Sequence, residues 1–134
     1  HEITAQLARS AVRASTNLPV KYVVLDTKTG RTGRYLAAFR GRKTVMAVCY
    51  QLHAQRILAL SYGVVPILRN QELRDKYHFL IDALEFLDQY SKLADDDLLA
   101  IVGGSFGPDG GASYIEFASV RNIRRRNAEI EAHK

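Results

Sequence analysis

The stretch from Lys21 to Thr32 reads KYVVLDTKTGRT and decides the fold class. Its first five residues, 21–25, are almost continuously apolar and rich in β-branched side chains, which is typical of a strand covered on both faces. Apolar residues return at helical spacing over residues 30–40. A buried strand followed by a helix is the repeating unit of α/β proteins, so we expect a sheet with helices on both faces.

The same alternation continues along the chain. Helical spacing predicts helices over residues 2–16, 51–61 and 72–90. Short apolar runs predict further strands over residues 44–49, 64–68, 98–102 and 113–120. The first four strands are separated by helices and should be parallel. The Gly-rich connection before the last strand is too short for a parallel crossover, so that strand should run antiparallel to the fourth.

Pro66 constrains the order of the strands. Proline cannot donate to a sheet ladder, so the third strand belongs at an edge. This favours a three-layer α/β/α fold with a mixed five-stranded sheet of order 3-2-1-4-5 over the flavodoxin-like order 2-1-3-4-5, in which Pro66 would be central. We expect one domain over residues 1–121, followed by a basic, solvated tail over 122–134, which holds all but the first residue of the run RNIRRR (121–126).

Composition restricts the function classes. Cys49 is the only cysteine, which excludes an internal disulfide and a cysteine metal cluster and favours a cytoplasmic location. The net charge of +5 suits an anionic partner, and no apolar run is long enough to span a membrane. The chain begins with His1 and lacks a signal peptide, and we expect it to be a piece of a longer protein.

The expected strand order places a ligand crevice between the carboxyl ends of strands one and four, where the winding reverses. The loop after strand one supplies hydroxyl groups, positive charge and a glycine that permits close backbone approach. These residues suit a phosphate, and equally a threonine-capped turn at the start of a helix. The candidate phosphate-binding residues are Thr27, Lys28, Thr29, Gly30, Arg31 and Thr32.

The loop after strand four is rich in glycine and could close over a ligand, or simply connect two antiparallel strands. Its candidate effector-loop residues are Gly104, Ser105, Phe106, Gly107, Gly110 and Gly111. The chain has no Walker A motif. We find no catalytic residues and no metal ligands at useful spacing, so the sequence indicates binding rather than chemistry.

Two segments resemble the C-terminal domain of pyruvate kinase. Residues 27–68, TKTGRTGRYLAAFRGRKTVMAVCYQLHAQRILALSYGVVPIL, resemble the family's Ser/Thr-Gly-x-Thr loop and the elements that follow it. Residues 103–117, GGSFGPDGGASYIEF, resemble its closing Gly-rich loop and last strand. The resemblance runs from the first helix to about Val120. The family's five-stranded sheet with an antiparallel last strand agrees with the order expected above.

The resemblance implies that phosphoryl transfer from phosphoenolpyruvate to ADP takes place on a separate TIM-barrel domain, which uses Mg²⁺ or Mn²⁺ and K⁺. No cofactor is then expected in this chain, which would be catalytically silent alone. The resemblance further implies an allosteric domain whose loop 27–32 holds a phosphate of the effector while the Gly-rich loop closes over it. Implied partners are the catalytic barrel and other subunits, in a tetramer or in a dimer through this domain.

Some features leave open which effector binds and whether the chain is a domain of a larger enzyme. Relatives activated by a sugar bisphosphate commonly place a Trp and an Arg near the start of the fourth helix, and this chain has no Trp. A monophosphate, such as a sugar phosphate or a nucleotide, is equally suitable. The alternative to a regulatory domain is a free-standing protein of this fold that binds or processes a phosphorylated metabolite. We expect neither a nucleic-acid partner nor a membrane partner.

Overall fold

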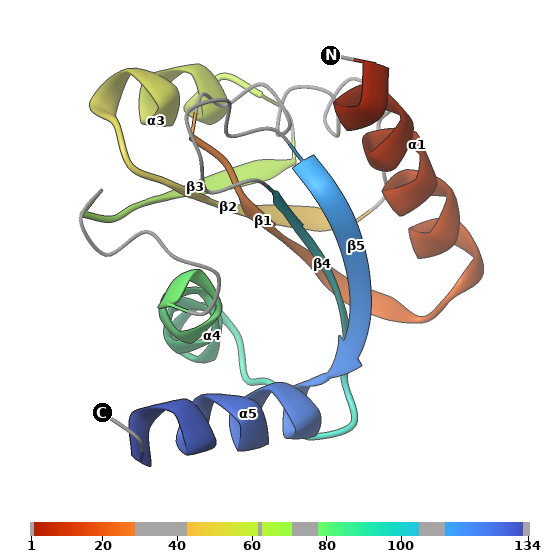
Figure 1. Cartoon of the computed structure of the whole chain (residues 1–134), viewed down its shortest axis with the longest axis vertical. Helices are drawn as coiled ribbons and strands as arrows, with labels where there is room; N and C mark the ends of the chain where they lie inside the picture. Colours follow the sequence, from red (N-terminus) through yellow and green to blue (C-terminus); the bar gives the residue numbers. More distant parts are fainter. Residues whose placement is uncertain (1, 29–42, 62, 71–77, 105–111, 133–134) are drawn as a thin grey trace.

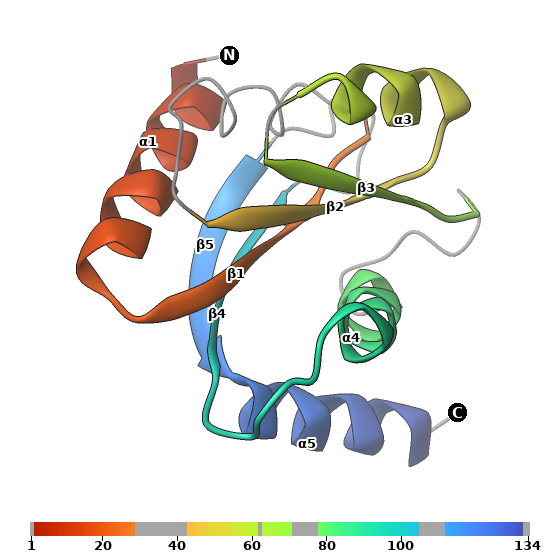
Figure 2. The same cartoon turned by 180° about the vertical axis from the view of Figure 1, so that it is seen from behind.

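A five-stranded sheet forms the centre of the molecule and carries helices on both faces (Figures 1 and 2). The computed structural model describes residues 2–28, 43–61, 63–70, 78–104 and 112–132. The strands are β1 (Val20–Asp26), β2 (Thr44–Cys49), β3 (Val64–Leu68), β4 (Leu98–Gly104) and β5 (Ala112–Ser119). The described helices are α1 (Glu2–Asn17), α3 (Leu52–Ala59), α4 (His78–Tyr90) and α5 (Val120–Ala132).

The strand order is β3-β2-β1-β4-β5, which confirms the predicted topology. Strands β1 to β4 are parallel, and β5 runs antiparallel to β4. Pro66 lies in the edge strand β3, opposite Ala47 of β2, as its missing N–H group requires. Helix α3 ends at Ala59, earlier than predicted, and Gly63 (φ 74°) belongs to the turn that enters β3.

Strand β1 separates two apolar cores. Its side chains alternate between the faces of the sheet, and all of them except Lys21 are buried. Tyr22 and Val24 enter the core covered by α4 and α5. Val23 and Leu25 enter the core covered by α1 and α3. The nearly continuous apolar run therefore reflects burial on both faces, as the sequence predicts.

Helix α5 continues directly from β5 and packs against the domain. The basic tail expected over residues 122–134 is, up to Ala132, part of this helix. Val120 and Ile123 are fully buried in the core under α4. These two side chains are three residues apart and share one face of the helix. The domain boundary expected after residue 121 therefore falls inside a helix that packs on the core.

The acidic turn at residues 95–97 receives the first amides of α5. The Val120 amide donates to the Asp97 carbonyl at 2.9 Å, and the Arg121 amide donates to the Asp95 carbonyl at 2.9 Å. The first amides of a helix have no partner within the helix, so they need acceptors of this kind. The turn thus fixes the direction in which α5 leaves the sheet.

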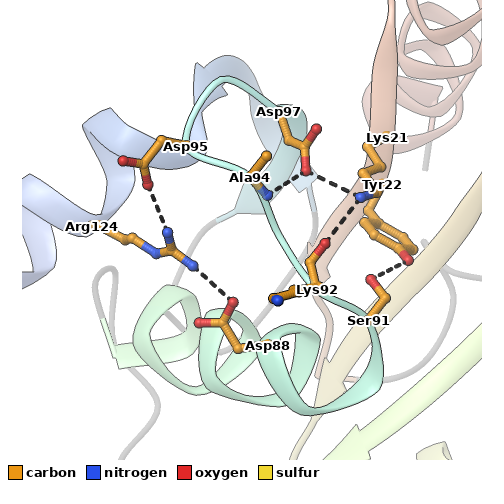
Figure 3. A network of polar contacts seen from close by, with 9 residues as sticks. All are labelled: Lys21, Tyr22, Asp88, Ser91, Lys92, Ala94, Asp95, Asp97 and Arg124. Atoms are coloured by element: carbon orange, nitrogen blue, oxygen red, sulfur yellow. Dashed lines mark hydrogen bonds and ion pairs between the residues drawn. The ribbon is translucent and has the colours of Figure 1, made fainter.

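The side chains of the same turn form ion pairs with two elements (Figure 3). Arg124 of α5 donates to Asp88 of α4 at 2.8 Å and to Asp95 at 2.7 Å. Lys21, on β1, pairs with Asp97 at 3.1 Å. Each of these pairs is partly exposed and contributes about 0–1 kcal/mol. Within the described part of the chain, no helix is long and apolar enough to cross a membrane.

We predict that Asp97 makes stability depend on pH. A hydrogen bond from the Ala94 amide, followed by the contact with Lys21, lowers the pKa of Asp97 below its ordinary value of 3.8. A lowered folded-state pKa adds stability above the unfolded pKa, and this stability is lost as the pH falls through the folded pKa. Asp97→Asn should therefore flatten the loss of unfolding free energy between about pH 5 and pH 2, measured by urea denaturation.

Asp96→Asn is the matched control, because Asp96 is exposed in the same turn and the change removes the same charge. It should keep the wild-type slope. Identical pH profiles for the two variants would show that the contacts of Asp97 contribute nothing.

We also predict that α5 is required for stability. Ile123→Ala removes a fully buried side chain and should cost about 2–5 kcal/mol in urea denaturation. Ile130→Ala, on the same helix but at a half-buried position, should cost about 1 kcal/mol or less. Equal, small losses for both variants would mean that α5 is not part of the core in solution.

Candidate functional site

The carboxyl ends of β1 and β4 lie side by side at one edge of the sheet. Leu25 of β1 pairs with Val102 of β4, and both strands continue beyond that pair. On its other side β1 pairs with β2, so the order of winding reverses between β1 and β4. Open α/β sheets bind ligands at such a reversal. The described strand order therefore contains the reversal of winding at which the sequence predicts a ligand crevice.

Three of the predicted site residues, Thr27, Lys28 and Gly104, are described. Thr27 is buried, and its amide donates to the Val48 carbonyl at 2.9 Å, which extends the contact between β1 and β2 past the end of the strand. That amide is therefore not available to a ligand. Lys28 is half-buried and is the first residue after it. The predicted residues outside the described ones are Thr29, Gly30, Arg31, Thr32, Ser105, Phe106, Gly107, Gly110 and Gly111.

A buried acidic side chain ends β1. Asp26 is 3% exposed, and the Tyr50 hydroxyl donates to its carboxylate oxygen Oδ1 at 2.6 Å. Tyr50 directly follows β2 and is 8% exposed. A hydrogen bond to a carboxylate is shorter and stronger than one between neutral groups. This pair ties the carboxyl end of β1 to the chain that leaves β2.

Asp26 and Tyr50 are not among the site residues predicted from the sequence. The available signal was their position, since each lies at or directly after the end of a predicted parallel strand at the ligand edge. An acidic residue that closes an apolar strand needs a buried donor, and a tyrosine one strand away can supply it.

Gly103 lies next to the end of β4, in close contact with an aromatic ring. A Cβ atom at this position would overlap the ring and the hydroxyl of Tyr114, its antiparallel partner on β5. Gly103 directly follows the pair of Val102 with Leu25, so it neighbours Asp26 across the sheet. The missing side chain at Gly103 therefore makes room for Tyr114 beside the carboxyl end of β1.

Two described cations lie just after strand ends at this edge of the sheet: Lys28, two residues after β1, and Arg69, directly after β3. The Arg69 amide donates to the Cys49 carbonyl at 2.8 Å, which extends the contact between β2 and β3. Its guanidinium lies 3.7 Å from the Asp82 carboxylate of α4. Part of its charge is therefore neutralised within the domain, which leaves Lys28 as the more available positive charge.

Cys49 has a structural role at the end of β2. Its side chain is fully buried, and its thiol lies 3.7 Å from the Ile67 carbonyl. Burial raises the pKa of the thiol to about 11, so it stays protonated at neutral pH and is a poor nucleophile. In the described ranges, no group of three or more His, Cys, Asp or Glu side chains could hold a metal ion.

Residues 5–116 match the family model described as the pyruvate kinase alpha/beta domain. The pyruvate kinase of Lactobacillus delbrueckii subsp. bulgaricus is 26% identical over 121 residues, and that of Borreliella burgdorferi is 25% identical over 124 residues. Each alignment covers 90% of this chain but only 20% and 26% of the relative. Pyruvate kinase 2 of Synechocystis sp. is 30% identical over 105 residues, which are 78% of this chain and 18% of the relative. The whole of α5 lies beyond residues 5–116, which the family model matches.

We predict that Gly103→Ala is destabilising because of Tyr114. The new methyl group overlaps the tyrosine ring, and overpacking of this kind costs about 1–3 kcal/mol. Tyr114→Ala removes the obstacle, so Gly103→Ala should cost clearly less in that background. The double-mutant cycle is measured by urea denaturation. Additive effects would contradict the contact between the two residues.

Proposed function

The chain belongs to the family of the pyruvate kinase alpha/beta domain, and on this basis we propose that it is the regulatory and assembly domain of a pyruvate kinase. In this proposal a phosphorylated small molecule binds at the loops after β1 and β4. The parent enzyme transfers the phosphoryl group of phosphoenolpyruvate to ADP on another domain, which also holds the Mg²⁺ or Mn²⁺ and K⁺ ions.

The observation that carries this proposal is that the two strand ends from which the loops leave lie side by side. The chain leaves β1 through Thr27 and Lys28 beside the end of β4 at Gly104, where the winding of the sheet reverses. Each loop contains the glycines that a close backbone approach to a ligand needs. No other pair of strand ends in the described sheet has this relation.

The residues of the first loop are chemically suited to a phosphate. Lys28 and Arg31 would supply positive charge, Thr29 and Thr32 hydroxyl donors, and Gly30 an accessible backbone amide. The Thr27 amide donates to Val48, so the backbone donors for a phosphate would begin at Lys28. The effector class is a sugar phosphate or a nucleotide.

Regulation would follow from differential affinity. An effector that binds one arrangement of the domains more tightly shifts the population toward it, and couplings of about 1–3 kcal/mol are typical. We propose the catalytic barrel as the domain that senses this shift.

The outer edge of β5 is the proposed contact between subunits. Strand β5 pairs with β4 on one side, and no described strand pairs with its other side. Phe117 is 38% exposed on this strand. An open edge can pair with the same edge of a second subunit across a two-fold axis.

We predict that the chain is stabilised selectively by a phosphorylated metabolite. The screen is a thermal-shift assay with inorganic phosphate, glucose 6-phosphate, fructose 1,6-bisphosphate, ribose 5-phosphate, AMP and ATP. A compound present at about 100 times its Kd adds about 2.7 kcal/mol and raises Tm by a few degrees. Arg31→Glu should weaken binding of the selected compound at least about tenfold, which corresponds to about 1.4 kcal/mol.

Arg121→Glu is the control, because Arg121 is exposed on α5 and the substitution changes the net charge by the same amount. It should leave binding unchanged. The proposal fails if no compound shifts the wild-type Tm, or if the two charge reversals weaken binding equally. The second result would indicate attraction by net charge alone.

A further inference from the structure

We propose that Tyr50 is a positioning residue for the phosphate-binding loop after β1, and that it acts through the Asp26 carboxylate. This inference rests on the function proposed above and adds a residue that lies outside the loop itself. It follows from the way in which the described residues hold the carboxyl end of β1.

The end of β1 is held at two consecutive residues. The Asp26 carboxylate accepts the Tyr50 hydroxyl at 2.6 Å, and the Thr27 amide donates to the Val48 carbonyl at 2.9 Å. One contact uses a side chain and the other uses the backbone, so together they restrict both the rotation and the displacement of this segment. Lys28, the next residue, therefore leaves the sheet in a defined direction.

Tyr50 is itself anchored to the sheet. It directly follows Cys49, whose carbonyl accepts the Arg69 amide at 2.8 Å. Its ring is 8% exposed and belongs to the core that includes Val48 and Ile67. The hydroxyl is therefore presented from a rigid base that joins the ends of β2 and β3, and Asp26 accepts it there.

Both members of the pair are buried, so we assign neither of them a direct contact with the ligand. Asp26 is 3% exposed, and a carboxylate in direct contact with a phosphate would repel it. The pair can favour binding by restricting the loop before a ligand binds. Less conformational entropy is then lost on binding, which raises the affinity. This is why we assign Tyr50 a positioning role.

The test compares two tyrosine variants of the 134-residue chain by NMR titration of backbone amides with inorganic phosphate. Tyr50→Phe should raise the apparent Kd for phosphate about three- to tenfold, the effect of losing roughly one hydrogen bond. Tyr22→Phe is the matched control. It also removes one tyrosine hydrogen bond of β1, to Ser91 at 2.7 Å, but lies near the opposite end of the strand. Its Kd should stay within about twofold of the wild-type value.

Substitutions at Asp26 test whether the carboxylate transmits the effect. Asp26→Asn keeps an oxygen that can accept the Tyr50 hydroxyl, so it should bind phosphate at least as tightly as the wild type. Asp26→Ala removes the acceptor and should weaken binding as much as Tyr50→Phe. Wild-type affinity in Asp26→Ala would overturn the inference.

Amide hydrogen exchange separates failure of this inference from failure of the proposed function. Tyr50→Phe should accelerate exchange at Thr27, whose amide donates to Val48, more than at Val24, whereas Tyr22→Phe should not. If the wild type binds phosphate and Tyr50→Phe binds it equally well, the inference is wrong and the proposed function stands. If the wild type does not bind phosphate, local acceleration of exchange in Tyr50→Phe alone still supports positioning, and equal exchange in both variants overturns it.

Discussion

Burial of β1 on both faces and along both edges dictates the arrangement of the other elements. A strand with apolar side chains in both directions needs helices on both faces, and here α1 and α3 cover one face while α4 and α5 cover the other. Its two edges are occupied by parallel strands, β2 and β4. The chain must therefore wind outward in two directions from β1, which creates the reversal at the candidate site.

Both ends of this strand are held by side chains, in very different environments. At the amino end, Lys21 forms a partly exposed ion pair with Asp97, which is worth about 0–1 kcal/mol. At the carboxyl end, the buried Asp26 accepts the Tyr50 hydroxyl, and loss of that donor would remove a charge-assisted hydrogen bond from a buried carboxylate, at a cost of about 1–3 kcal/mol. The carboxyl end is therefore the one whose geometry is more strongly specified by a side-chain contact.

The topology was predictable because it depends on strong local signals. Continuous apolar runs identified the strands, and Pro66 identified the edge strand. Helix α5 was not recognised because arginines surround its buried residues. Ile123 lies between Arg121 and Arg124, so the sequence alone resembles a solvated tail. The acidic turn at residues 95–97 pairs with Arg124 and accepts the first amides of the helix. That partner is distant in sequence, so only tertiary structure reveals it.

The candidate site shows the same division between local and distant information. The loop composition suggested phosphate binding, but the loss of the Thr27 amide to Val48 depends on the register between β1 and β2. The contact between Asp26 and Tyr50 likewise joins residues that are separated by a crossover. These contacts hold the carboxyl ends of β1 and β2 together, and packed cores do not deform continuously. A ligand bound there would therefore act by moving loops or shifting the packing between domains, because the sheet beneath it has little freedom to move.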